Sequence, residues 1–172
     1  DRDFGFFAHY TTKHLIFRGA LTSGEGRNSD ISNNGLATTG RIEFLPFGPF
    51  TGENDYQEGD LDREQTVKVS LGTTYSHNER ALRQSGQLGN DLYESRTMDA
   101  FEIDLLLKYN GWASYSEFMN RSANDPITVD PDDPTKIRPV YDGYGMLSQL
   151  SYLFKNNFEI AGRYSMTTPF ST

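Results

Sequence analysis

The stretch TVKVSLGTTY at residues 66–75 decides the fold, because its apolar and polar residues alternate with a period of two. In an extended chain, Val67 and Leu71 fall on one side and Lys68 falls on the other. The stretch FEIDLLLKY at residues 101–109 repeats this alternation, and no window of comparable quality has helical spacing. A period of two indicates β-strands whose two faces meet different surroundings. We therefore predict an all-β protein.

About eight strands follow from this alternation, and most of them are about 9–12 residues long. Soluble sheets most often use strands of about five or six residues, whereas about 9–11 tilted residues cross the hydrocarbon core of a bilayer. The strand length therefore favours an antiparallel, up-and-down transmembrane β-barrel. The predicted strands are residues 4–10, 14–22, 36–45, 65–76, 98–110, 112–122, 143–154 and 157–166.

The connections between these strands alternate between short and long. An outer-membrane barrel has this asymmetry, with short periplasmic turns and long external loops. Aromatic residues gather near both predicted rims, as in the girdles of such barrels. Residues 46–64 break the rule, because they lie on the short-turn side yet form a connection of about nineteen residues. Tight turns are predicted at residues 11–13, 110–111 and 155–156, and long polar loops at 23–35, 77–97 and 123–142.

The composition argues against several other classes of protein. The net charge is −8, from 16 Lys and Arg against 24 Asp and Glu, so no basic surface is available for nucleic acid. No run of about 18 apolar residues exists, which excludes a membrane-spanning helix. The absence of cysteine excludes thiolate catalysis and Cys-ligated zinc, and the three histidines have neither metal-ligand spacing nor a partnered nucleophile. We expect no enzyme activity, no cofactor and no metal site.

Two connections are rich in carboxylates, at residues 53–64 and 125–133. Such groups suit Ca²⁺, which takes about six to eight oxygen ligands. Neither run matches the calcium loop of the EF-hand, so we interpret both as solvated acidic loops and keep calcium binding as the alternative.

The block GRIEFLPFGPFTGENDYQEGDLDREQTVKVSL at residues 40–71 is preceded by LTSGEGRNSDISNNGLATTGR and followed by GQLG and YLFKNNFEIAGRYS. Together these segments resemble the phosphate-selective porin O and P family, in particular its Bacteroidetes-type members. The resemblance covers essentially the whole chain. It implies an outer-membrane channel of about sixteen or more strands for small solutes.

Members of that family are considerably longer than this chain, which ends in PFST without the terminal aromatic strand of such barrels. We therefore expect residues 1–172 to be part of a single β-barrel domain, about half of a barrel of about 16–18 strands. A self-contained eight-stranded barrel, with an interior just filled by side chains, is the alternative.

If the apolar face meets lipid, the charged face lines a water-filled lumen. Such charges screen passing ions, or they pair across strands and hold the wall together. A phosphate path needs a cationic ladder, and the nearly balanced charges of this face depart from that pattern. The candidate pore-lining residues are Arg18, Arg41, Glu43, Lys68, Glu102, Asp104, Lys108, Glu117, Arg121, Glu159 and Arg163.

These features predict a porin of the bacterial outer membrane that allows passive diffusion of small hydrophilic solutes or ions, anions such as phosphate among them. Its partners are outer-membrane lipid, the permeants, and a homo-oligomer such as a trimer or an envelope-protein complex. One alternative is a β-barrel scaffold or assembly component of an outer-membrane complex with a blocked lumen. Another is a soluble ligand-binding barrel, in which the apolar face points inward.

Overall fold

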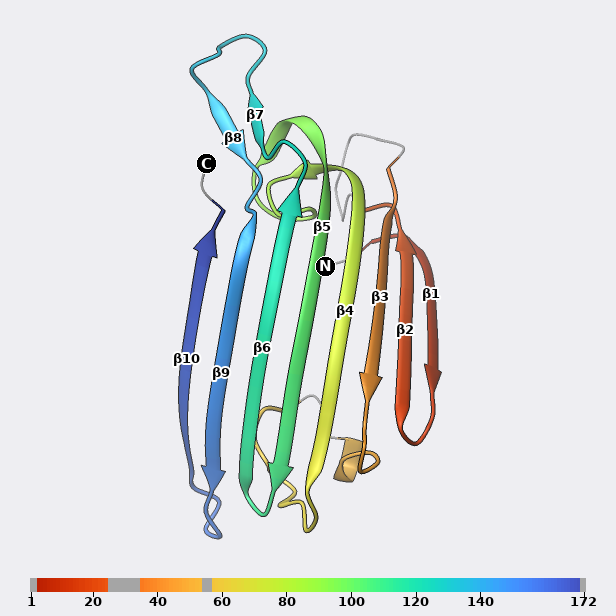
Figure 1. The fold of residues 1–172 in the computed structure, drawn as a ribbon, viewed down its shortest axis with the longest axis vertical. Coiled ribbons are helices and arrows are strands. Elements are labelled where there is room, and N and C mark those ends of the chain that lie inside the picture. Colours follow the sequence, from red (N-terminus) through yellow and green to blue (C-terminus); the bar gives the residue numbers. More distant parts are fainter. Residues whose placement is uncertain (1–2, 25–34, 54–56, 171–172) are drawn as a thin grey trace.

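The computed structural model describes residues 3–24, 35–53 and 57–170, and these residues form an all-β structure (Figure 1). A short 3₁₀ turn, η1, covers Thr51–Glu53. In the described residues no helix is long and apolar enough to cross a lipid bilayer. The strands are β1 (Gly5–Thr11), β2 (Leu15–Thr22), β3 (Ala37–Phe44), β4 (Lys68–Arg83), β5 (Asp91–Tyr109), β6 (Trp112–Ala123), β7 (Ile127–Val129), β8 (Ile137–Pro139), β9 (Gly143–Leu153) and β10 (Glu159–Pro169).

Eight of these strands make one antiparallel sheet in the order β1-β2-β3-β4-β5-β6-β9-β10, and β7 and β8 form a separate hairpin. The predicted up-and-down order of about eight strands is confirmed. The sheet is open among the described residues, because the edge strands β1 and β10 each pair with one neighbour only. Its β5–β6 turn and residues 45–53 and 57–67 lie at the lower end of Figure 1, and the β4–β5 and β6–β9 connections lie at the upper end.

The prediction of a long loop at residues 77–97 is wrong, because most of these residues belong to strands. β4 continues to Arg83 and β5 begins at Asp91, so this hairpin extends well beyond its predicted length. The pairing register shifts between Asn78 and Ala81, and Arg80 there has a positive φ of 53°. Such bulges interrupt the period of two, which is why the alternation is lost in this segment.

The two remaining long loops differ in what the structure describes. The predicted loop at residues 123–142 contains the hairpin of β7 and β8, whose three-residue strands are too short to show a period. Most of the predicted loop at residues 23–35 lies outside the described residues, as does Asp55 of the first acidic run.

The sheet has an apolar face that is largely uncovered. The register places Phe44, Leu71 and Leu105 in one row across β3, β4 and β5, and all three side chains are exposed. Leu105 is 37% exposed and Ile160, on β10, is 56% exposed. The described chain has an accessible surface of 10802 Å², whereas a compact soluble protein of 19.5 kDa has about 8500 Å². The apolar side chains therefore do not form the core of a compact soluble fold.

Aromatic side chains gather on this face at both ends of the sheet. At the lower end, the rings of Trp112 and Tyr152 have centroids 4.7 Å apart, and Tyr152 and Phe154 follow at 4.8 Å. At the upper end, Phe118 and Tyr144 lie 6.3 Å apart. Two aromatic clusters thus flank the aliphatic middle of the apolar face.

The β5–β6 turn depends on a glycine. Asn110 and Gly111 both have positive φ, at 49° and 89°, as the predicted type I′ turn requires. A Cβ atom at Gly111 would lie 2.6 Å from the carbonyl oxygen of Leu153. We therefore expect Gly111→Ala to lower the free energy of unfolding by about 1–3 kcal/mol, as measured by denaturant titration.

Gly162→Ala is the matched control, because no atom lies within 4 Å of a Cβ built at this position of β10. Its unfolding midpoint is expected to stay close to that of the unchanged protein. Equal midpoints for the two variants would contradict the turn geometry.

Candidate functional site

All eleven predicted charged residues lie on the face opposite the apolar one. One row of the register joins Glu43, Gly72, Asp104 and Glu117 across β3, β4, β5 and β6. The next row joins Arg18, Arg41, Thr74 and Glu102 across β2 to β5. Toward the lower end Lys68 pairs with Lys108 in the register, whereas Arg121 lies nearer the upper end and Glu159 and Arg163 lie on β10.

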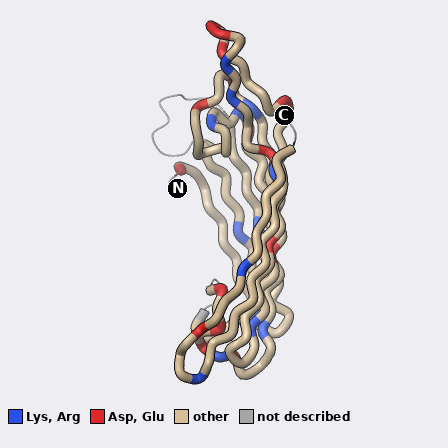
Figure 2. The backbone as a smooth tube through the Cα atoms, turned by 90° about the vertical axis from the view of Figure 1, so that its left-hand side faces the viewer, with Lys and Arg blue, Asp and Glu red and all other residues tan. Residues whose placement is uncertain are grey.

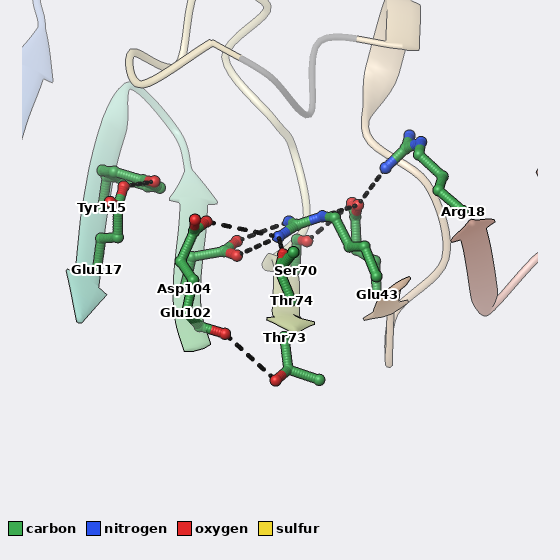
Figure 3. Close-up of polar contacts among 10 residues, drawn as sticks. Arg18, Glu43, Ser70, Thr73, Thr74, Glu102, Asp104, Tyr115 and Glu117 are labelled. Carbon is green, nitrogen blue, oxygen red and sulfur yellow. Dashed lines mark hydrogen bonds and ion pairs between the residues drawn. The ribbon is translucent and has the colours of Figure 1, made fainter. Parts of the chain in front are cut away.

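Six of these residues form a charged belt at the middle of the sheet (Figure 3). Its centre is a two-bonded ion pair, in which Arg41 Nη1 and Nη2 donate to Asp104 Oδ2 and Oδ1 at 2.6 and 3.0 Å. Asp104 is only 6% exposed, so this pairing compensates the cost of burying its charge. The charged belt consists of Arg18, Arg41, Glu43, Glu102, Asp104 and Glu117.

Glu43 is the second buried carboxylate of the belt. Arg18 Nη1 donates to its Oε2 at 3.0 Å, and Ser70 Oγ donates to its Oε1 at 3.0 Å. Arg41 Nε lies 3.6 Å from the same Oε2. The guanidinium groups of Arg18 and Arg41 are therefore both engaged with carboxylates of the wall. The predicted pairing of charges across neighbouring strands is confirmed for Arg18 of β2 and Glu43 of β3, whereas Arg41 of β3 reaches across β4 to Asp104 of β5.

Gly72 makes the central ion pair possible. It lies on β4 between Glu43 and Asp104, so the Arg41 side chain must pass over it to reach β5. A Cβ atom at Gly72 would lie 2.3 Å from both Arg41 Nη2 and Asp104 Oδ2. The missing side chain therefore leaves the space in which the guanidinium and the carboxylate meet.

Two further carboxylates of the belt are less closely paired with cations. Glu102 Oε1 lies 3.8 Å from Arg41 Nη1, and Glu117 Oε2 accepts a hydrogen bond from the hydroxyl of Tyr115. Glu117 is the direct neighbour of Asp104 in the register, where like charges repel. The belt has an excess of two negative charges, because four carboxylates (Glu43, Glu102, Asp104, Glu117) oppose two guanidiniums (Arg18, Arg41).

The lower part of the charged face is covered by the long connection between β3 and β4. Leu45 and Phe50 pack against Ile16 of β2 and Leu106 of β5, and these four buried residues form one apolar cluster. We call the described residues 45–53 and 57–64 the strap. A cavity of about 460 Å³ lies between the strap and the belt. It is lined by Arg18, Arg41, Glu43, Gln57, Glu58, Ser70, Thr74, Glu102, Asp104, Leu106 and Tyr115.

Several of the remaining predicted residues contact the strap. Lys68 Nζ donates to the carbonyl oxygen of Phe47 at 3.1 Å, and Lys108 Nζ lies 5.1 Å from the centre of the Phe50 ring. Arg163 forms an ion pair with Glu58. The strap was not predicted to cover this face, although its unusual length and its run FLPFGPF were the available signals.

The upper part of the charged face is covered by the tip of the β4–β5 hairpin. Gln87 Nε2 in this tip donates to Asp3 Oδ2 at 2.9 Å. Because Asp3 precedes the edge strand β1, this hydrogen bond joins the hairpin tip to the edge of the sheet. Asp3 also accepts hydrogen bonds from Ser23 Oγ and from the backbone N–H of Gly24. Partial burial opposes the ionisation of Asp3, but these hydrogen bonds outweigh it and hold its pKa below the ordinary value.

Arg121, the remaining cation, lines the cavity below this tip, and its guanidinium Nη1 lies 3.5 Å from the carbonyl oxygen of Tyr141. Glu159 begins β10 beside Gly59 of the strap. In the described part of the chain, no three His, Asp or Glu side chains converge in a way that would hold a metal ion.

Neither a family model, nor a curated protein, nor a solved structure matches this chain. The two faces of the sheet differ in their chemistry. Charged groups are buried, paired and partly covered on one face, while aliphatic and aromatic groups are exposed on the other.

The ion pair at Gly72 leads to a prediction about stability. Gly72→Ala would place a methyl group where Arg41 and Asp104 meet, and would leave a nearly buried carboxylate without its best partner. We expect the free energy of unfolding to fall by about 1–3 kcal/mol.

Gly40→Ala is the matched control, because Gly40 lies on the neighbouring strand β3 with no atom within 4 Å of the position of a Cβ. Denaturant titration of both variants measures the difference. The interpretation is wrong if Gly40→Ala destabilises the protein as much as Gly72→Ala does.

Proposed function

We propose that this chain forms part of a transmembrane β-barrel of the bacterial outer membrane, through which small hydrophilic solutes or ions diffuse passively. The observation that carries the proposal is the opposite character of the two faces. The side chains of Leu71, Leu105 and Ile160 are exposed, whereas Glu43 and Asp104 are buried on the other face. This is the reverse of a soluble sheet, and it matches a wall between hydrocarbon and a polar lumen.

Strand length and the aromatic clusters support the same proposal. β4, β5, β6, β9 and β10 have 16, 19, 12, 11 and 11 residues, and about 9–11 tilted residues cross a bilayer. The aromatic clusters at the two ends of the apolar face correspond to the girdles at the two membrane interfaces. The lower end, with its tight β5–β6 turn, is then the periplasmic side.

The open edges favour a barrel larger than the described sheet. β1 and β10 leave rows of backbone N–H and C=O groups without strand partners, and such groups are very costly in a bilayer core. Closure through further strands, to about 16–18 in total, satisfies them. An eight-stranded closure would bring β10 against β1, whereas the two edges lie apart in Figure 1.

The pairing in the belt bears on which solutes pass. A phosphate path is favoured by guanidinium or ammonium groups that face the solute, but Arg18 and Arg41 are both bound to carboxylates of the wall. The excess of negative charge in the belt favours small cations and neutral solutes. The second candidate function, a scaffold with a blocked lumen, is favoured by the cover that the strap and the β4–β5 hairpin provide.

The orientation of the two faces is tested by cysteine labelling, because the chain has no native cysteine. In proteoliposomes, Leu105→Cys is expected to react with a lipid-soluble maleimide and to resist a charged one. Ser165→Cys, on the charged face of β10, is exposed and is expected to react with the charged reagent. The reverse pattern would indicate a soluble barrel, and both variants in denaturant serve as the reactivity control.

Charge preference is tested by reversal potentials of the complete protein in planar bilayers under a KCl gradient. We expect a K⁺ to Cl⁻ permeability ratio above 1, and a fall of about twofold in that ratio for the double variant Glu102→Gln/Glu117→Gln. Glu94→Gln, which removes an exposed carboxylate of the β4–β5 hairpin, is the control for net charge. A preference for Cl⁻ in the unchanged protein would contradict the cation assignment.

A further inference from the structure

The strap crosses the hollow side of the curved sheet at its lower end (Figure 2). Near β2, the carbonyl oxygen of Leu45 accepts a hydrogen bond from His14 Nδ1 at 2.9 Å. On the far side, Glu58 forms an ion pair with Arg163 of β10. The strap therefore contacts the sheet both beside β2 and at β10. The other turns at this end contain only a few residues.

We propose that the strap is the constriction of the passage, and that the carboxylate of Asp60 is the latch that fixes it over the lumen. The inference rests on the proposed function, since a constriction has meaning only where solutes pass. Beyond the proposed function, the inference identifies the strap as the segment that limits the size of the solutes, and Asp60 as the residue that holds the strap in place.

Asp60 has the contacts expected of a latch. It is only 1% exposed, and its Oδ2 accepts a hydrogen bond from the backbone N–H of Gly111 in the β5–β6 turn at 2.7 Å. Both carboxylate oxygens also accept from the backbone N–H of Glu64, at 3.0 and 3.1 Å. One buried carboxylate thus joins the strap to the sheet, and its bonds to backbone N–H groups stabilise the negative charge.

Two neighbours of Asp60 extend this attachment. The guanidinium of Arg63 donates to the carbonyl oxygens of Leu153, the last residue of β9, at 2.8 Å, and of Phe154, which follows it. The carboxylate of Glu64 accepts from the backbone N–H and the hydroxyl of Thr51, at 2.5 and 3.0 Å. The second half of the strap is therefore bonded to its own first half and to two separate hairpins of the sheet.

The apolar contacts show that the strap lies within the hollow. Phe50 and Leu45 are almost completely buried on a face that otherwise carries charges, and Phe50 lies below the belt against Leu106. A solvated acidic loop, as predicted for residues 53–64, would not be held by buried apolar side chains of this kind. The strap and the belt both line the cavity between them, with Glu58 on the strap and Glu102 on the belt. The strap therefore narrows the space beside this part of the sheet.

The decisive experiment compares single-channel conductance of the complete protein with that of Asp60→Asn in planar bilayers. Asparagine keeps one acceptor oxygen and loses the negative charge, so at least one of the three hydrogen bonds from Gly111 and Glu64 is lost and the others become weaker at nearly unchanged volume. We expect conductance to rise by about twofold or more, with added current noise. Asp62→Asn removes the same charge from an exposed position of the strap and is the control.

A second variant keeps the inference testable if the first one changes stability. Gly59 and Glu159 are adjacent, since a Cβ at Gly59 would lie 2.8 Å from Glu159 Oε1. Gly59→Cys/Glu159→Cys in the Asp60→Asn background, joined by a short bis-methanethiosulfonate, ties the strap to β10 again. We expect the crosslink to restore the lower conductance, and a reducing agent to reverse the effect.

The outcomes separate this inference from the proposed function. If the unchanged protein conducts and neither Asp60→Asn nor the crosslink alters conductance, the strap is not the constriction, although the pore proposal stands. If the unchanged protein is silent and Asp60→Asn conducts, the strap closes the lumen, which supports the latch and favours the scaffold function. If no variant conducts, both proposals are overturned.

Discussion

The structure depends on the alternation of side chains across one sheet, because successive residues of its strands point to opposite faces outside the irregular part of β4 and β5. Backbone N–H and C=O groups are satisfied between strands, so each face is free to differ in chemistry. Here one face exposes Leu71, Leu105 and Ile160, and no second layer covers them among the described residues. In water such a face would drive association, whereas in hydrocarbon it needs no cover. This uncovered apolar face is the feature on which the proposed place in a lipid bilayer depends.

The charged side chains at the middle of the sheet all lie on one face, where they become crowded. The belt meets this constraint by pairing Arg41 with Asp104 and Arg18 with Glu43, and by omitting a side chain at Gly72. The Arg18–Glu43 pair joins the neighbouring strands β2 and β3, and the Arg41–Asp104 pair joins β3 to β5 across β4. They also engage the guanidinium groups that an anion would otherwise bind. The same contacts that join the strands therefore leave Arg18 and Arg41 less available to an anion.

The sequence predicted what depends on neighbouring residues, and it failed where distant contacts decide. Alternation at residues 66–75 and 101–109 identified both faces, and Asn110-Gly111 identified a tight turn. The bulges after Asn78 removed the period of two, so the extension of β4 was missed. The position of the strap was missed for another reason. Asp60 meets Gly111 and Arg63 meets Leu153 across 51 and 90 positions of the chain, and no local pattern contains such pairs.

The unusual length of the β3–β4 connection has a physical explanation in the strap. Ordering a segment of this length costs conformational entropy at every residue, so a two-residue turn would suffice if the connection only reversed the chain. The cost is offset by the burial of Leu45 and Phe50 and by the hydrogen bonds of Asp60, Arg63 and Glu64. All of these contacts direct the segment into the hollow of the sheet. A connection that is stabilised in that position narrows the space beside the belt. In the proposed pore, this narrowing lies at the periplasmic end.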